Sequence, residues 1–138
     1  MVLPTERITI TPDIEVVDAV ALPTRTYHLD FKRGCCCGFI DGQKAMEQAI
    51  FKVLHTIRFK HLIYTHNYGF QNMMGYDELY VRGDLARRIH EALLQDERIN
   101  SLENFSLEFT SKDDVLVTFT ARTIYGDVSL LKEAIRIA

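Results

Sequence analysis

The sequence predicts a small α+β domain, with two main helices packed on one face of an antiparallel or mixed sheet. Its 138 residues, 47% hydrophobic and 25% charged, have the composition of an ordinary single globular domain. Two stretches repeat apolar residues at steps of three and four, and several others alternate apolar with polar residues. The alternating stretches come in pairs joined by short turns, so we expect hairpins with antiparallel pairing.

The two ends of the chain are predicted to be extended arms around a domain of residues 24–127. All three prolines lie in residues 1–23, which favours an extended N-terminal arm. This arm is apolar at positions such as Val16 and Val20, so it either folds back on its own domain or lies on a neighbouring subunit. Residues 128–138 are expected to form a C-terminal arm, as a helical turn or a last strand.

A hairpin is predicted to precede the first helix. Residues 25–31 alternate, residues 32–34 form a turn, and residues 35–40 return as a second strand. Asp41 is placed to accept hydrogen bonds from the first free N–H groups of a helix that continues to about Ile57.

The pattern then changes from helix to strand and back. Residues 61–66 are expected to form a short buried strand, and Asp77 is expected to open a second helix that runs to about Gln95. The solvent side of this helix is predicted to carry Arg82, Arg87, Arg88 and Glu91. Residues 105–110 and 115–122 alternate cleanly, which predicts a β-hairpin with one face on the core.

The residues that carry chemistry form no recognisable catalytic, cofactor or metal site. Cys35, Cys36 and Cys37 are consecutive, so in a strand they point to alternate faces, and we expect small buried hydrophobes rather than zinc ligands. The five histidines form no i, i+4 pair, and no nucleophile elbow or glycine-rich phosphate loop is present. The 19 acidic residues leave a small glycoside hydrolase as an alternative. A structural or interaction protein is the preferred class.

Charge, hydropathy and cysteine content indicate which kinds of partner and compartment are expected. The net charge is −3 and the pI about 5.9, which gives no electrostatic case for nucleic acid. No apolar run is long enough for a membrane span, and no basic stretch followed by an apolar block indicates a signal peptide. Three cysteines fit a reducing compartment better than a disulfide framework.

The sequence resembles a known family over about residues 24–127. The likeness is carried by residues 38–42, 62–64 and 67–69 in the first half, and by residues 87–96 and 123–126 in the second. In these stretches the chain resembles the XkdS-like tail proteins of contractile-tailed phages and phage-derived bacteriocins. Those proteins are similar to the sheath initiators found in the baseplates of contractile injection machines.

The resemblance implies a structural, non-enzymatic baseplate component that nucleates sheath polymerisation by strand exchange. Its implied partners are the tail sheath protein, the baseplate wedge proteins and the tail tube, with no nucleic acid and no membrane. It also implies a six-fold ring in the virion or bacteriocin particle, after synthesis in the bacterial cytoplasm. A generic adaptor in another intracellular complex is the alternative.

The same resemblance locates a candidate protein interface. The related initiators carry a Glu-Pro-Arg motif after the second helix, which docks them on the wedge, and residues 96–98 occupy this place with Glu97 where the motif has proline. The expected interface residues are Asp96, Glu97, Arg98, Arg122, Tyr125, Val128, Leu130 and Leu131. Arg58 is expected to be internal and to pair with Asp96 or Glu97.

Overall fold

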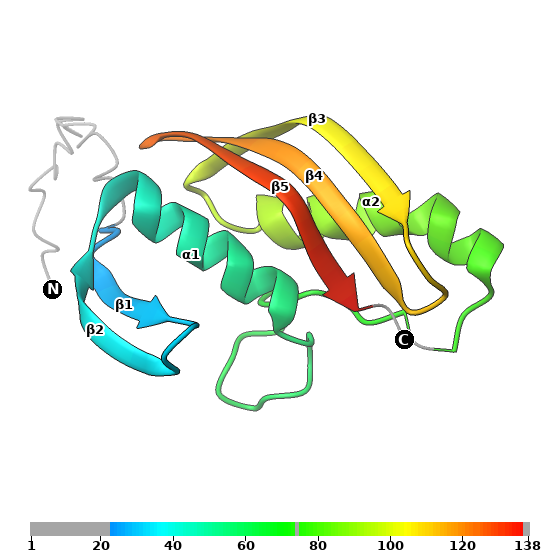
Figure 1. Cartoon of the computed structure of the whole chain (residues 1–138), viewed down its shortest axis with the longest axis horizontal. Coiled ribbons are helices and arrows are strands. Elements are labelled where there is room, and N and C mark those ends of the chain that lie inside the picture. Colours follow the sequence, from blue (N-terminus) through cyan, green and yellow to red (C-terminus); the bar gives the residue numbers. More distant parts are fainter. Residues whose placement is uncertain (1–22, 74, 137–138) are drawn as a thin grey trace, which may run out of the picture.

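The computed structural model describes residues 23–73 and 75–136. The elements in chain order are β1 (Thr26–Asp30), β2 (Cys35–Ile40), α1 (Gly42–His55), α2 (Glu78–Leu94), β3 (Ile99–Phe109), β4 (Asp114–Thr123) and β5 (Gly126–Arg136). The α+β class is confirmed. The strands form two separate antiparallel sheets, a β1–β2 hairpin and a sheet in the order β3-β4-β5 (Figure 1). The predicted N-terminal arm, up to residue 22, lies outside the described residues.

The three-stranded sheet has one apolar and one polar face. Along β4, Val115, Val117 and Phe119 are buried and alternate with partly exposed residues, as expected for a sheet with one covered face. Both helices cover this apolar face (Figure 1). On the polar face, Arg122 on β4 pairs with Glu103 on β3 at 2.8 Å.

The C-terminal segment is a strand of this sheet. Residues 128–138 were expected to form an arm, but β5 pairs with β4 from Gly126 to Arg136. Val128, Leu130 and Ile135 are buried in the core. Of the two conformations that the sequence left open, the last strand is therefore the one adopted.

One hydrophobic core joins the helices to the sheet. Its fully buried large side chains are Phe119, Met46, Ile50, Met73, Leu85, Ile89, Leu93, Ile135, Val115 and Val117. The helical members recur at steps of three and four, so the two apolar stripes are confirmed as the inner faces of α1 and α2. None of the helices in the described part of the chain is long and apolar enough to cross a membrane.

Helix α1 begins at the residue that the sequence indicated. The Asp41 carboxylate accepts a hydrogen bond from the Gly42 backbone N–H at 2.7 Å. The Thr24 hydroxyl donates to the same carboxylate and lowers the pKa of Asp41, as does the Gly42 N–H. Thr24 thereby joins the start of the β1–β2 unit to the start of α1.

Helix α2 contains an unexpected buried charge. Arg88 was assigned to the solvent side, but its side chain is only 7% exposed. Its Nε donates to Asp84 at 2.7 Å, one turn earlier, and its guanidinium lies 5.5 Å from the centre of the Tyr76 ring. The local carboxylate and the aromatic ring offset part of the cost of burying the cation.

The expected buried strand at residues 61–66 is wrong. This segment is a series of turns, and Leu62 is fully exposed (104%). The Arg58 N–H donates to the Phe70 carbonyl at 2.9 Å, and the Phe70 N–H donates to the Thr56 carbonyl at 2.8 Å. These bonds close the segment into a projecting loop, which Figure 1 shows below the C-terminal end of α1.

Candidate functional site

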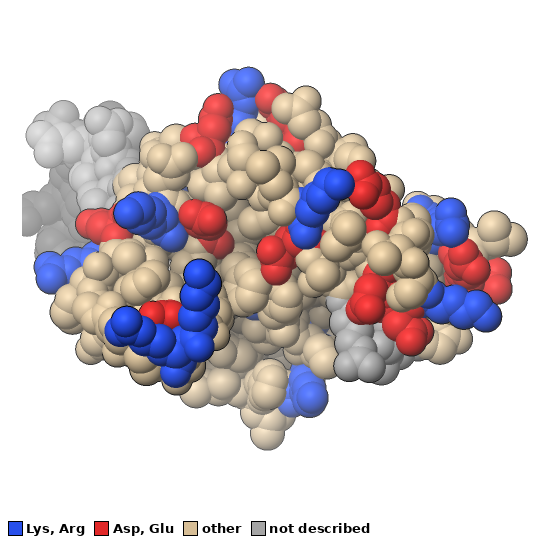
Figure 2. Space-filling model, viewed as in Figure 1, with Lys and Arg blue, Asp and Glu red and all other residues tan. Residues whose placement is uncertain are grey.

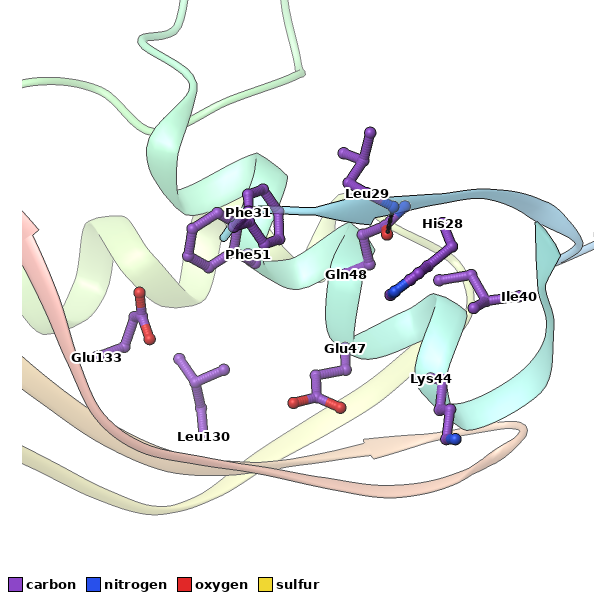
Figure 3. Close-up of a pocket in the computed structure, with 10 residues that line it drawn as sticks. All are labelled: His28, Leu29, Phe31, Ile40, Lys44, Glu47, Gln48, Phe51, Leu130 and Glu133. Atoms are coloured by element: carbon purple, nitrogen blue, oxygen red, sulfur yellow. Dashed lines mark hydrogen bonds between the residues drawn. The ribbon is translucent and has the colours of Figure 1, made fainter. Parts of the chain in front are cut away.

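A groove separates the β1–β2 hairpin from the three-stranded sheet. It has a volume of about 350 Å³, with α1 as its floor and β1 and β5 as its two sides (Figure 3). Its lining residues are His28, Leu29, Phe31, Ile40, Lys44, Glu47, Gln48, Phe51, Leu130 and Glu133. The rings of Phe31 and Phe51 pack against each other in a tilted arrangement, 4.5 Å between ring centres, so the apolar part of the lining is preformed.

On the β1 side of the groove, a side chain occupies the strand edge. The Leu29 N–H donates to Gln48 Oε1 at 2.8 Å, and Gln48 Nε2 donates to the Tyr27 carbonyl at 2.9 Å. The amide of Gln48 thus makes the two bonds that a neighbouring strand would make. Gln48 is buried, so these bonds are protected from water. This edge of β1 has no room for another strand at Tyr27 and Leu29.

On the β5 side, the strand edge is largely open. Gln43 Nε2 donates to the Asp127 carbonyl at 2.5 Å, which shows that Asp127 directs its backbone groups away from β4. Because backbone direction alternates along a strand, the N–H of Ser129 points the same way. Near the other end, His55 Nε2 lies 3.6 Å from Glu133 Oε1. That contact joins two side chains and leaves the backbone of β5 free. Between Asp127 and Glu133, the side-chain bond to a β5 backbone group among the described residues is that from the Lys132 N–H to Thr118 Oγ1 at 3.1 Å, and Thr118 belongs to the neighbouring strand β4.

This arrangement suits an extended peptide. A chain that lies beside β5 can bond to its open backbone groups and place alternate apolar side chains against Leu29, Phe51 and Leu130. The charged lining residues Lys44, Glu47 and Glu133 are spread over two elements. No serine, threonine or cysteine is among the described residues that line the groove.

The residues expected as an interface do not lie together. Leu130 lines the groove, whereas Val128 is buried in the core and Leu131 is exposed. Arg122 lies on the polar face of the sheet and Tyr125 in the turn after β4, where it packs partly buried against the core. The groove beside β5 therefore contains only part of the predicted interface.

The remaining predicted residues, 96–98, line a second hollow of about 490 Å³ at the end of α2. Arg98 makes two bonds to Asp96, from Nε at 2.9 Å and from Nη2 at 2.6 Å. Burial raises the pKa of Asp96, but the bonds from the side chain and backbone of Arg98 outweigh it, so the carboxyl titrates below its ordinary range. Glu97 is exposed beside this rigid pair. We call the hollow that these three residues line the 96–98 hollow.

Arg58 does not pair with the 96–98 hollow. Its Nη1 bonds to Glu91 on α2 at 3.1 Å, so the expected pairing with Asp96 or Glu97 is wrong. Asp96 is already engaged by Arg98, and Glu91 lies on the exposed side of α2 above the loop that begins at Arg58. An internal arginine was expected correctly, since its side chain is 12% exposed.

The cysteines are exposed rather than buried. All three lie on β2, which pairs only with β1 among the described strands, so neither side of the strand at these positions enters the core. The Cys35 and Cys37 sulfurs lie 3.1 Å apart, and this contact is the largest cause that raises the pKa of Cys37. At neutral pH that thiol stays protonated. No group of three possible metal ligands occurs in the described part of the chain.

Two residues that matter for the groove were not singled out from the sequence. Gln48 stands on the apolar stripe of α1 between Ala45 and Ile50, where a polar residue is unusual, and its position was the available signal. Gln43 is exposed in the first turn and gave no such signal.

Comparison with known proteins decides the family. The family model described as contractile injection system sheath initiator matches residues 19–126. The chain belongs to the sheath initiator family. It is 32% identical over 124 residues to the phage-like element PBSX protein XkdS of Bacillus subtilis (strain 168). The aligned region covers 86% of this chain and 87% of that protein. This sheath initiator is thus a baseplate component of a contractile tail, as the resemblance implied.

Proposed function

We propose that this sheath initiator starts sheath polymerisation by accepting an extended strand from the first sheath ring along β5. The observation that carries the proposal is the difference between the two sides of the groove. Gln48 occupies the edge of β1, whereas on β5 the outward N–H of Ser129 takes no side-chain bond among the described residues. Adding a strand to an open sheet edge satisfies its backbone groups and gives affinity with little dependence on sequence.

The initiator further docks on the baseplate wedge through the 96–98 hollow and surrounds the tail tube as a six-fold ring. The two proposed contacts use different parts of the molecule, because the groove lies beside β5 and the hollow lies at the end of α2. One copy can therefore hold the wedge and the sheath at the same time. Its role is structural rather than enzymatic, in a particle made in the bacterial cytoplasm.

The test compares two substitutions of the same exposed residue. Ser129→Pro removes the outward N–H and leaves the ladder to β4 in place, as proline does at a sheet edge. Ser129→Thr retains that N–H and serves as the control. Both variants and the wild type are co-expressed with the neighbouring tail genes and recovered by an affinity tag. We expect Ser129→Pro to lose sheath protein while keeping baseplate proteins, and Ser129→Thr to keep both.

Two results oppose the proposal. Equal recovery of sheath by both variants shows that the strand does not pair at this part of β5. Recovery of unrelated cellular proteins and no tail proteins by the wild type favours a generic adaptor instead.

A further inference from the structure

The projecting loop of residues 58–67 is held at its base by the backbone and is hereafter called the tip loop. Arg58 and Phe70 are joined by a 2.9 Å backbone bond, and Ile57 and Phe70 form a parallel bridge. Gly69 lies against the backbone of Thr56 and Arg58, and only glycine fits there, because an added Cβ would be 2.7 Å from the Thr56 oxygen. The two limbs therefore leave the body at a fixed point.

Arg58 also braces the interior of the tip loop. Its Nε donates to the His66 carbonyl at 2.7 Å and its Nη1 to Glu91 at 3.1 Å. One side chain thus joins the outgoing limb, the returning limb and α2. The loop is held in a projecting shape, which a docking element needs if it is to bind with little loss of conformational entropy.

The apex of the tip loop is apolar and uncovered. Leu62 is fully exposed (104%), Ile63 is 87% exposed and Phe59 is 62% exposed. Ring contacts such as Tyr64 with Tyr68, at 4.6 Å between centres, stiffen the loop without covering this apex. Large apolar side chains that project together into water mark contact surfaces on soluble proteins.

Charge and position indicate what covers the apex. Residues 57–70 include no Asp or Glu, and Figure 2 shows no acidic side chain on this projection. Of the two basic residues in this range, Arg58 is already paired with Glu91, whereas Lys60 is exposed. The returning limb lines the 96–98 hollow through Thr65, Asn67 and Tyr68. The tip loop and the hollow are thus one continuous surface, and Figure 1 shows the loop on the far side of α1 from β3 and β4.

We propose that the tip loop inserts Leu62 and Ile63 into an apolar cleft with an acidic rim, on the same baseplate protein that docks at the 96–98 hollow. The inference rests on the proposed function and names the chemistry of that partner. The apolar apex enters the cleft, and Lys60 lies against the acidic rim. Such a contact excludes water from the neighbouring 96–98 hollow, where the Asp96–Arg98 pair lies.

The test uses full-length protein co-expressed with the neighbouring tail genes. The double variant Leu62→Ser and Ile63→Ser removes the apolar apex, and the matched control Leu79→Ser changes a residue of α2 that is 79% exposed. Because all three side chains are exposed, the thermal unfolding of both variants should match the wild type. Binding to purified baseplate protein should weaken about 100-fold in the double variant, which is the scale for two buried aliphatic side chains. Leu79→Ser should bind unchanged, and both variants should still recover sheath.

Three results overturn this inference. The first is full baseplate binding by the double variant, and the second is loss of sheath alone, which would place the loop in the sheath contact. The third is a double variant that differs from the wild type only in self-association or in binding to anionic lipid vesicles. A wild type that recovers neither sheath nor baseplate protein rejects the proposed function itself, and the inference falls with it.

Discussion

Replacing Gly69 with alanine should destabilise the protein through the base of the tip loop. Gly69 has φ of +100°, a conformation that costs an L-residue about 1–2 kcal/mol. The added Cβ would lie 2.7 Å from the Thr56 oxygen and 3.1 Å from the Arg58 nitrogen. The Thr56 oxygen accepts the Phe70 N–H at 2.8 Å, so moving it weakens a bond worth about 0.5–1.5 kcal/mol.

Together these terms give a loss of about 1.5–3.5 kcal/mol in the free energy of unfolding, or a Tm lower by about 5–10 °C. The matched control is Gly83→Ala in α2, where an added Cβ meets nothing within 4 Å. That change should raise the free energy of unfolding by about 1 kcal/mol, because alanine favours helix over glycine. Urea unfolding followed by circular dichroism measures both. Equal stability of Gly69→Ala and wild type would refute the packing described at this corner.

Three further predictions concern the two helices and β5. Arg87 and Arg88 lower the pKa of Asp84, so the ionised carboxylate of Asp84 stabilises the fold above about pH 4, and this stabilisation is lost as pH falls. The free energy of unfolding of Asp84→Asn should therefore fall less on acidification than that of the wild type. Truncation after Asp127 should abolish cooperative unfolding rather than trim an arm, because β5 supplies buried core residues; a truncated protein with a native-like thermal transition would contradict this. Gln48→Ala should speed hydrogen exchange at the Leu29 amide more than at α2 amides, since its acceptor is removed, and unchanged exchange would mean that this bond does not protect β1.

The spacing of apolar residues correctly predicted the elements that bury one face against the core. The two helices and the long hairpin were found because their apolar residues repeat at the spacing of one face. The same reasoning gave a wrong prediction for the tip loop. Residues 61–66 have a strand-like composition, but neither of the sheets in the described part of the chain covers them, and the presence of a covering layer is a property of the tertiary fold.

The prediction that the cysteines are buried is wrong for a related reason: the β1–β2 hairpin is a sheet apart from β3-β4-β5, and within the described part of the chain no layer covers its outer face. Arg88 shows a different limit. It follows Leu85 by three positions and so faces the core side, although it was assigned to the solvent side with Arg82, Arg87 and Glu91. The carboxylate of Asp84, four residues earlier, was the local signal that it would be paired.

The candidate site was predictable only in part. Leu130 was expected at an interface and lies in the groove, whereas the importance of Gln48 depends on which strand edge its amide reaches. Sequence patterns give the face of an element but not the neighbour that the face will meet. The open edge of β5 follows from the strand order, which no local pattern determines.

The most direct test of strand acceptance at β5 is the polymerisation of purified sheath protein followed by light scattering. Substoichiometric wild-type initiator, bound to its baseplate partner, should shorten the lag before sheath assembly, and the same amount of Ser129→Pro should not. A lag that is the same with wild type, with Ser129→Pro and with no initiator would contradict the claim that this edge nucleates the sheath.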